Sequence, residues 1–372
     1  MDTLSLFPSN ETAPYATLLG LVSHYSPSGE EKEVVDWLVE RMRFLGYNRA
    51  YRDAAGNAVG VIGDGPNQVV LLGHIDTVPG QIPVRVEGDI LYGRGSVDAK
   101  GPLASFVDAA AHPAAPAGWQ YVVIGCVDEE RDSEGARFVA EHYHPAAVIV
   151  GEPSGWDRLT LGYKGSAWAE INLKQSLAHT ASLTPSVCEM GFQLWKAIKD
   201  WTETYNLDQE RTFDKVSPTL RRFASGEDGF QEWARLRIGA RLPLALKIQD
   251  WYKQLDQIVG QLSLNQQAGP DLDIQMTPTG FAIPAYLGEK NTRLVRAFLS
   301  GIRSVQGQPG FLLKSGTADM NIVAPLWGCP AVAYGPGDSS LDHTPNEKIS
   351  LDEYNRSVQV VRQVLHEISN AS

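Results

Sequence analysis

Long hydrophobic runs are absent from this sequence, which has no apolar stretch near the roughly 18 residues that a membrane-spanning helix needs. Its first residues lack the basic and apolar regions of a secretory signal peptide. Cysteine is also scarce: the three cysteines stand singly, in neither a disulfide framework nor a Cys-x-x-Cys ligand pair. We therefore expect a cytoplasmic protein that does not act in a membrane and has no structural disulfides.

Positive charge is in short supply, because the 372 residues carry a formal net charge of -12. Nucleic-acid binding requires a basic face, so a nucleic-acid partner is excluded. The hydrophobic content of 43% is that of an ordinary globular protein. Arginines gather at one place, where they form either a basic patch or a solvated strand face: Arg221, Arg222, Arg235, Arg237 and Arg241.

Helical and strand patterns alternate along the first 162 residues. Ser28 and Glu31 have capping-box spacing before an apolar-periodic stretch that stops at Gly46. Apolar runs predict buried strands, and periodic segments and a Gly-Asp turn lie between them. The expected elements are strands at 69–72, 121–127 and 147–150, a hairpin near 88–89, and helices at 101–111 and 135–143.

The pattern of apolar and polar residues changes after Gly162 and changes back near residue 278. Residues 163–175 and 232–242 read as half-exposed strands, and 186–205 and 245–262 as amphipathic helices. Helices at 291–305 and 351–368 and strands at 311–314 and 330–334 then resume the first pattern. The expected fold class is therefore α/β, with a discontinuous domain at 1–162 and 277–372 and a two-layer α+β insert at 163–276.

Acidic and histidine side chains follow the predicted buried strands. In "GHIDTVPG" His74 and Asp76 come directly after an apolar run, and "GRGSVDAKG" places Asp98 in a glycine-rich turn. Each such residue alone also fits a helix cap or a solvated turn. The full set is more specific, since ligands gather where parallel strands end. The set of such residues also includes Glu129 and Glu130 in "GCVDEERDSEG", Glu152 in "VIVGEPS" and His343 in "YGPGDSSLDHTPNE".

Two divalent metals account for these residue types. Zinc takes imidazole nitrogen and carboxylate oxygen, and a pair of metals needs one shared carboxylate. Two histidines and three carboxylates supply one histidine and one carboxylate per metal, plus a bridge. Asp76 is placed to accept the other N–H of His74. One acidic group is then left over. Glu129 and Glu130 are adjacent, so one of them can bind metal while the other acts as the base that takes a proton from water.

The motifs "GHIDTVP", "GRGSVDAKG", "DEE", "GEPS", "SGTADMN" and "DHTPNE" occur in this order along most of the chain. Together they resemble the co-catalytic zinc aminoacylase and carboxypeptidase family that contains acetylornithine deacetylase and succinyl-diaminopimelate desuccinylase. The resemblance implies a zinc-exopeptidase-like catalytic domain with a mixed, mostly parallel sheet, interrupted by a lid that forms a homodimer. It implies two divalent ions, Zn²⁺ foremost and Co²⁺ as the alternative.

The resemblance also implies individual roles. His74, Asp98 and Glu152 would hold one metal, and Asp98, Glu130 and His343 the other. Glu129 would be the general base and acid, with Asp76 orienting a ligand. In "LAHTASLTP" His179 would support the oxyanion, with Thr180-Ala181 where the family usually has serines. Substrate contacts would come from Arg241, Gly316, Thr317 and Asp319.

Two stretches, "GEPSGWDRLTLGYKG" and "GRGSVDAKGPLASF", are most similar to one branch of this family. Enzymes of that branch release lysine, and in some organisms ornithine, from the terminal glutamate side chain of the small acidic carrier protein LysW, in lysine and arginine biosynthesis. Carrier and enzyme would then both be acidic, so docking needs a local basic patch. Arg221, Arg222, Arg235 and Arg237 are the candidates.

Other functions share the same motifs. An N-acetylornithine or N-acetyl-lysine deacetylase would use the same site on a different acyl group. A dipeptidase or carboxypeptidase is a further alternative, and a catalytically silent binding protein on this scaffold is another. The complete set of ligand and base positions argues against the silent protein.

Overall fold

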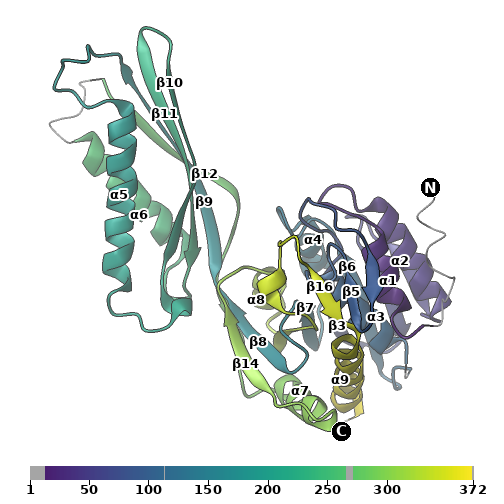
Figure 1. Ribbon diagram of the computed structural model, residues 1–372. Helices are drawn as coiled ribbons and strands as arrows, with labels where there is room; N and C mark the ends of the chain where they lie inside the picture. Colours follow the sequence, from purple (N-terminus) through teal and green to yellow (C-terminus); the bar gives the residue numbers. More distant parts are fainter. Residues whose placement is uncertain (1–12, 113, 265–270, 371–372) are drawn as a thin grey trace, which may run out of the picture. The chain divides into compact units, whose positions relative to one another are not determined.

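Figure 1 shows the computed structural model, which describes residues 13–112, 114–264 and 271–370. The chain forms two compact units. The first comprises Met1–Gly162, Gly288–Leu313 and Ala318–Ser372, and the second comprises Tyr163–Leu287 and Lys314–Thr317. The boundary expected at residue 276 falls inside strand β12 (Asp273–Ile283), which belongs to the sheet of the second unit.

A large mixed sheet organises the first unit, and its strands follow the order β1-β2-β6-β3-β7-β15-β8, with β14 beside β8. The four central strands β6, β3, β7 and β15 are parallel. β1 runs antiparallel to β2, β2 runs antiparallel to β6, and β8 runs antiparallel to β15. The bounds are β1 Arg49–Arg52, β2 Ala58–Gly63, β3 Asn67–His74, β6 Trp119–Cys126, β7 Ala147–Gly151, β8 Arg158–Tyr163, β14 Gly310–Lys314 and β15 Ala331–Tyr334.

A hydrophobic core between this sheet and helices includes Leu71 of β3, Val123 of β6 and Ile149 of β7. Nearly all side chains of these central strands are buried, as expected for parallel strands covered on both faces. The helices are α1 Ala16–Ser23, α2 Lys32–Phe44, α3 Lys100–Ala110, α4 Glu134–His142, α7 Arg293–Ser304, α8 Met320–Trp327 and α9 Leu351–Asn370.

The strand register aligns the carboxyl ends of the central strands. His74 at the end of β3 pairs with Cys126 at the end of β6, and Gly73 pairs with Gly151 at the end of β7. Gly151 also pairs with Tyr334, the last residue of β15. Residues that follow these four strands therefore start from one edge of the sheet, which is where open α/β sheets bind ligands.

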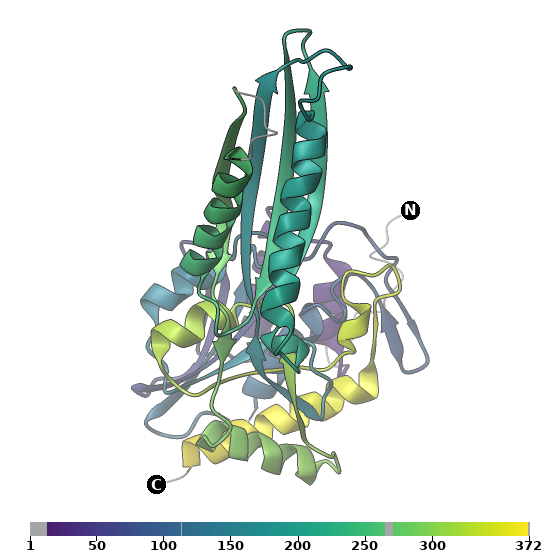
Figure 2. The same cartoon turned by 90° about the vertical axis from the view of Figure 1, so that its left-hand side faces the viewer.

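A four-stranded antiparallel sheet of order β10-β11-β9-β12 forms the second unit together with two helices. Figure 2 shows α5 and α6 along the same face of this sheet. Ile171, Leu236, Leu194 and Trp251 are buried in the core between the two layers. The bounds are β9 Gly165–Ser176, α5 Val187–Asn206, β10 Ser217–Glu227, β11 Gln231–Leu242 and α6 Ile248–Ser263.

The remaining elements are short. A three-stranded sheet of order β16-β5-β4 contains the hairpin that the sequence predicts. No helix among the described residues has the length and apolar character needed to cross a membrane. The bounds are β4 Arg85–Glu87, β5 Ile90–Tyr92, β13 Tyr286–Leu287, β16 Lys348–Ser350 and the 3-10 helices η2 Thr212–Asp214 and η3 Ser339–Leu341.

Candidate metal centre

His74 is the last residue of β3 and is buried with a fixed ring orientation. Its Nδ1 lies 3.0 Å from the backbone oxygen of Asp76 and 3.4 Å from Oδ1 of the same residue. Its Nε2 lies 3.2 Å from Oδ1 of Asp98. Asp76 therefore holds one ring nitrogen, which leaves the other to face the carboxylate of Asp98, as in metal-ligating histidines with a carboxylate behind them.

Asp98 connects two histidines that are 269 positions apart in the printed sequence. Its Oδ1 faces Nε2 of His74, and its Oδ2 lies 3.1 Å from Nε2 of His343. Nε2 of His343 is also 3.0 Å from Oε2 of Glu130. A carboxylate that presents one oxygen to each of two imidazoles has the arrangement that a bridging metal ligand requires.

The donor set fits a divalent cation. One ligand atom each from His74, Asp98 and Glu130 lie within 4.8 Å of one another. Imidazole nitrogen and carboxylate oxygen are the donors that zinc accepts, and cobalt suits the same donors. His343 adds a second imidazole to this group through its contacts with Asp98 and Glu130. These four residues come from four separate segments of the chain, as the strand-end pattern predicts.

The electrostatics of the centre favour positive charge. Hydrogen bonds with Asp98 and Glu130 raise the pKa of His343 to about 10. Burial opposes a charged imidazole at His74, but hydrogen bonds with Asp76 and Asp98 outweigh it and raise the pKa well above the usual value. Burial also opposes the charge of Asp98, yet the two histidines hold the pKa of that carboxyl far below its usual range. A cation placed among these groups would compete with the protons that the histidines hold.

Glu129 lies beside the centre in a different environment from Asp98. Burial raises the pKa of the Glu129 carboxyl well above the usual value, His74 opposes this shift, and Asp319, Glu152 and Glu130 add to it. A carboxylate whose pKa is raised in this way is suited to take up and return a proton near neutral pH. Glu152, which directly follows β7, is buried and close enough to act on this charge.

Asp76 orients the loop that carries the two glutamates as well as the ring of His74. Its Oδ1 accepts the backbone N–H of Glu129 at 3.1 Å, and its Oδ2 accepts that of Glu130 at 3.2 Å. The hydroxyl of Ser28 also donates to Oδ2 at 2.6 Å. The expectation that Ser28 caps a helix is therefore wrong: α2 begins at Lys32 after Glu31, and no side chain caps it.

Glu347 supports Asp98 from a position that the sequence did not identify as part of the site. Its buried carboxylate accepts the backbone N–H groups of Val97 at 2.9 Å and Asp98 at 3.0 Å on Oε1. Its Oε2 accepts a hydrogen bond from Nη1 of Arg94 at 2.9 Å. Because all three bonds involve the loop of residues 94–98, Glu347 fixes the backbone from which the Asp98 carboxylate extends.

Replacing Glu347 by Gln is expected to weaken metal binding by about 10- to 100-fold, the usual effect of losing a partner that orients a ligand. The amide nitrogen would face either the Arg94 guanidinium or two backbone N–H groups, all of which are donors. Competition with a chromophoric chelator measures the metal affinity. The matched control is Glu353→Gln, because Glu353 also accepts two backbone N–H groups but contacts neither Val97 nor Asp98. Equal metal affinity in the Glu347 variant and the natural protein would contradict this role.

Four of the residues predicted to contact the substrate or the oxyanion belong to the second unit. Nη1 of Arg241 in β11 donates to Oγ1 of Thr317 at 3.0 Å, and Gly316 precedes that threonine. His179 is exposed, and its Nδ1 accepts the backbone N–H of Ala181 at 3.1 Å. The role of His179 stays a prediction.

Asp319, which the resemblance implies as a substrate contact, is a buried residue of the first unit with 1% of its surface exposed. Its contact with substrate stays a prediction. Burial raises the pKa of its carboxyl to about 7. Asp319 is therefore part of the protein interior, and its negative charge is one of those that raise the pKa of Glu129.

Comparisons with known proteins agree with this fold. The chain is 43% identical to the [LysW]-lysine hydrolase of Deinococcus radiodurans, over 92% of this chain and 94% of that protein. It is 40% identical to a putative [LysW]-lysine/[LysW]-ornithine hydrolase of Pyrococcus abyssi, over 93% and 91% of the two chains. The YxeP protein of Bacillus subtilis, described as a dinuclear metal-binding peptidase, shares the fold with a TM-score of 0.70 at 12% identity, over 97% and 99% of the chains.

The family model described as peptidase family M20/M25/M40 matches residues 70–367. This range begins within β3 and includes every strand end that contributes to the centre. The sequence motifs, the fold and the identity to relatives over most of the chain agree, and the chain belongs to the M20/M25/M40 peptidase family.

Proposed function

We propose that this protein is a metal-dependent amide hydrolase that releases lysine, with ornithine as the alternative product, from the γ-carboxyl of the carboxyl-terminal glutamate of LysW. The observation that carries the proposal is the shared carboxylate of Asp98 between His74 and His343, with Glu129 beside it. The names of the relatives at 43% and 40% identity support the carrier-linked substrate.

The proposed ligands divide into two groups that share Asp98. His74, Asp98 and Glu152 would hold one divalent ion, and Asp98, Glu130 and His343 the other. Zn²⁺ is the expected ion and Co²⁺ the alternative, since both accept this donor set. When bound, such ions activate a water and polarise the carbonyl of the bond to be cut.

Glu129 is the proposed general base and acid. Its carboxylate accepts the proton of the attacking water and then gives a proton to the departing α-amine of lysine. Hydrogen bonds from the backbone N–H groups of Glu129 and Glu130 to Asp76 hold this segment in place. The base and one ligand are thus adjacent in sequence and are oriented by the same carboxylate.

Groups of the second unit are proposed to bind the substrate. The guanidinium of Arg241 would pair with a substrate carboxylate, and its hydrogen bond to Thr317 keeps the side chain extended toward residues 316–317. His179 would donate to the oxyanion, reaching the site of the partner subunit in a homodimer. Donors placed where negative charge develops lower the barrier of acyl transfer.

Direct assay of purified protein on carrier-linked lysine tests the proposal. We expect kcat/KM for lysine attached to LysW to exceed that for N-acetyl-lysine and N-acetylornithine by at least ~100-fold, because a site built for one acyl group leaves polar groups unpaired with another. Liquid chromatography of released lysine provides the measurement. Protein stripped of metal and reloaded with Zn²⁺ or Co²⁺ is the control. Preference for an acetylated amino acid would instead identify a deacetylase.

A further inference from the structure

A fully buried lysine lies at the start of the second unit. Lys164 directly precedes β9, and lysine is rarely buried in this way unless the protein supplies acceptors for its ammonium group. Its Nζ donates to the backbone oxygen of Thr212 at 3.2 Å, to that of Lys215, and to Oγ of Ser217 at 3.1 Å. These three acceptors match the three N–H groups of an ammonium, so the side chain of Lys164 is bound to one short segment of the chain.

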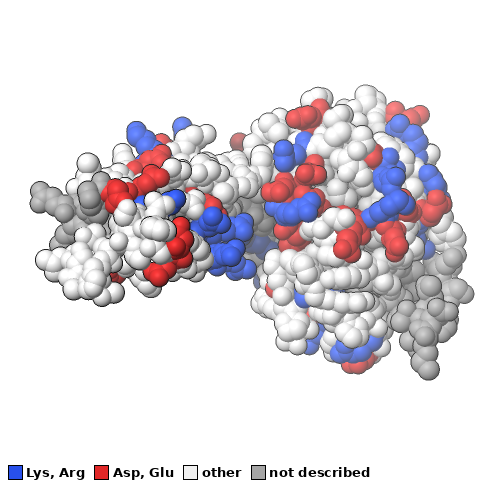
Figure 3. Space-filling view, turned by 90° about the horizontal axis from the view of Figure 1, so that it is seen from above, with Lys and Arg blue, Asp and Glu red and all other residues white. Residues whose placement is uncertain are grey.

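Arginines of β11 lie on the face of this sheet opposite to α5 and α6. Arg235, Arg237 and Arg241 alternate with residues such as Leu236 and Ile238, whose side chains are buried in the core under the two helices. Because strand side chains alternate between faces, the three arginines point away from the helices. Figure 3 shows a cluster of Lys and Arg side chains on the surface of this unit.

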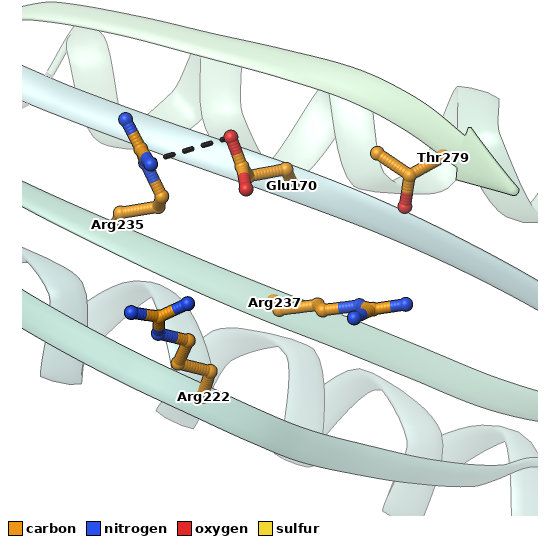
Figure 4. A pocket seen from close by; sticks show the side chains of 5 residues that line it. All are labelled: Glu170, Arg222, Arg235, Arg237 and Thr279. Atoms are coloured by element: carbon orange, nitrogen blue, oxygen red, sulfur yellow. Dashed lines mark ion pairs between the residues drawn. The ribbon is translucent and has the colours of Figure 1, made fainter.

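Arg241 has different neighbours from the other two arginines of β11. A cavity of about 160 Å³ on this face does not include Arg241 and is lined by Arg222, Arg235, Arg237, Glu170 and Thr279 (Figure 4). Arg241 is instead flanked by two serines, because its direct cross-strand partners are Ser217 of β10 and Ser166 of β9. Side chains directly opposite each other in an antiparallel pair are adjacent on the same face.

Lys164 is connected to Arg241 by two routes. Through Nζ it binds the hydroxyl of Ser217, which is directly opposite Arg241 in β10. Its backbone N–H donates to the oxygen of Lys314 at 3.1 Å, at the start of the second-unit segment that ends at Thr317. Oγ1 of Thr317 accepts the hydrogen bond from Nη1 of Arg241 at 3.0 Å. The same lysine therefore holds both a cross-strand neighbour of Arg241 and the segment that orients its guanidinium.

The positive charges of Lys164 and Arg241 also act on each other. Burial lowers the pKa of Lys164 to about 8, and the charge of Arg241 contributes to this shift, whereas Asp214 opposes it. A carboxylate bound to Arg241 would therefore be attracted by both cations. Arg241 is half-buried, so its guanidinium can reach a ligand, whereas Lys164 is fully buried.

We propose that Lys164 is a positioning residue of the substrate-carboxylate subsite, and that it holds Arg241 in the orientation that binds the carboxylate through its contacts with Ser217 and with the segment ending at Thr317. This inference rests on the proposed function, which assigns the carboxylate contact to Arg241. Lys164 itself does not touch the substrate, because its ammonium group is buried and bound to residues 212–217.

Lys164→Met tests this role with carrier-linked lysine as the substrate. Methionine is unbranched and uncharged, so it fills the buried volume and removes the three hydrogen bonds. We expect KM to rise about 10-fold, the usual effect of weakening one hydrogen bond to a charged group. We expect kcat to stay nearly the same, because Arg241 contacts a carboxylate that does not react.

Gln175→Met is the matched control, because Gln175 is a buried polar residue at the opposite end of β9. Its Nε2 donates to the backbone oxygen of Pro185 at 2.8 Å and to Oε1 of Glu232 at 2.6 Å. Thermal unfolding should show a lower Tm for both variants, whereas only Lys164→Met should change KM. An equal rise of KM in the control would attribute the effect to lost stability of the second unit and would overturn the positioning role.

A double-mutant cycle with Arg241→Gln shows whether Lys164 acts through Arg241. We expect Lys164→Met/Arg241→Gln to have the same KM as Arg241→Gln alone, because a positioning residue has no effect once the group that it positions is gone. Effects on KM that multiply would show that the two residues act independently, which would contradict the inference.

Ser217→Ala gives a milder test that does not depend on the folding of the Lys164 variant. It removes only the hydroxyl that Lys164 binds opposite Arg241. We expect KM to rise about 3-fold, the size of one ordinary hydrogen bond. An unchanged KM in this variant would count against the route through Ser217 and would overturn the inference as stated.

Failure of the proposed function would give a different result. Natural protein that hydrolyses N-acetyl-lysine but not carrier-linked lysine would overturn the proposed substrate. The same cycle measured on N-acetyl-lysine would still decide the role of Lys164, since that compound also has a free carboxylate. Natural protein that hydrolyses neither compound would overturn both proposals.

Discussion

Glu129→Gln is expected to lower kcat by about 10²–10⁴-fold, the usual contribution of general acid–base catalysis. Glutamine has the shape of glutamate but takes up no proton at neutral pH. The backbone N–H of Glu129 would still donate to Asp76, so the loop should keep its conformation. Metal content should stay the same, because the cluster of close ligand atoms comprises His74, Asp98 and Glu130 and does not include Glu129.

Metal analysis and steady-state kinetics on the same preparation check both parts of this expectation. Glu134→Gln is the matched control, since Glu134 is an exposed glutamate in the first turn of α4, five residues farther along. It should keep natural turnover. A Glu129 variant with near-natural kcat would assign the base to another residue, and one that had lost its metal would make Glu129 a ligand.

The strand-end pattern allowed most of the centre to be predicted. Apolar runs marked β3, β6 and β7, and each is followed within four residues by a histidine or an acidic residue. Parallel strands with aligned carboxyl ends bring such residues to one edge. The distances show that His74, Asp98, Glu130 and His343 meet, as predicted. Strand ends account for His74, Glu130 and His343, whereas Asp98 lies in the glycine-rich loop before α3.

Residues that support the ligands had no comparable signal. Glu347 contacts the backbone of Asp98 across 249 positions, and in sequence it is one charged residue in a turn. Ser28 has the sequence environment of a helix cap, yet its hydroxyl bonds to Asp76. Local patterns indicate local structure, whereas these contacts depend on how the tertiary fold brings distant loops together.

The boundary of the second unit was missed for a different reason. In β12 the apolar alternation of Ile274 and Met276 gives way to Thr277-Pro278-Thr279-Gly280, a composition typical of a turn, so the sequence pattern indicates that the strand ends near residue 276. β12 is held by its pairing with β9, which supplies backbone hydrogen bonds whatever its side chains are. The insert therefore extends past residue 276, where its composition already resembles a loop.

Asp98→Asn is expected to remove the bound metals as well as the activity, whereas Glu129→Gln should remove only the activity. The amide would keep one acceptor oxygen and present an NH₂ group to one of the two imidazoles. We expect fewer than two bound ions per chain and a fall in kcat of at least ~10³-fold, since without the shared carboxylate neither ion is fully held.

Mass spectrometry of bound metal and kinetics in excess Zn²⁺ measure this loss, and Asp132→Asn, in the loop that carries Glu130, is the control. Two bound ions in the Asp98 variant would show that this residue does not bridge them. The pair of variants separates two roles that activity alone confuses. Activity lost with the metals retained identifies a proton-transfer group, whereas activity lost together with the metals identifies a ligand. The two carboxylates need this separation because the charges of both act on His74.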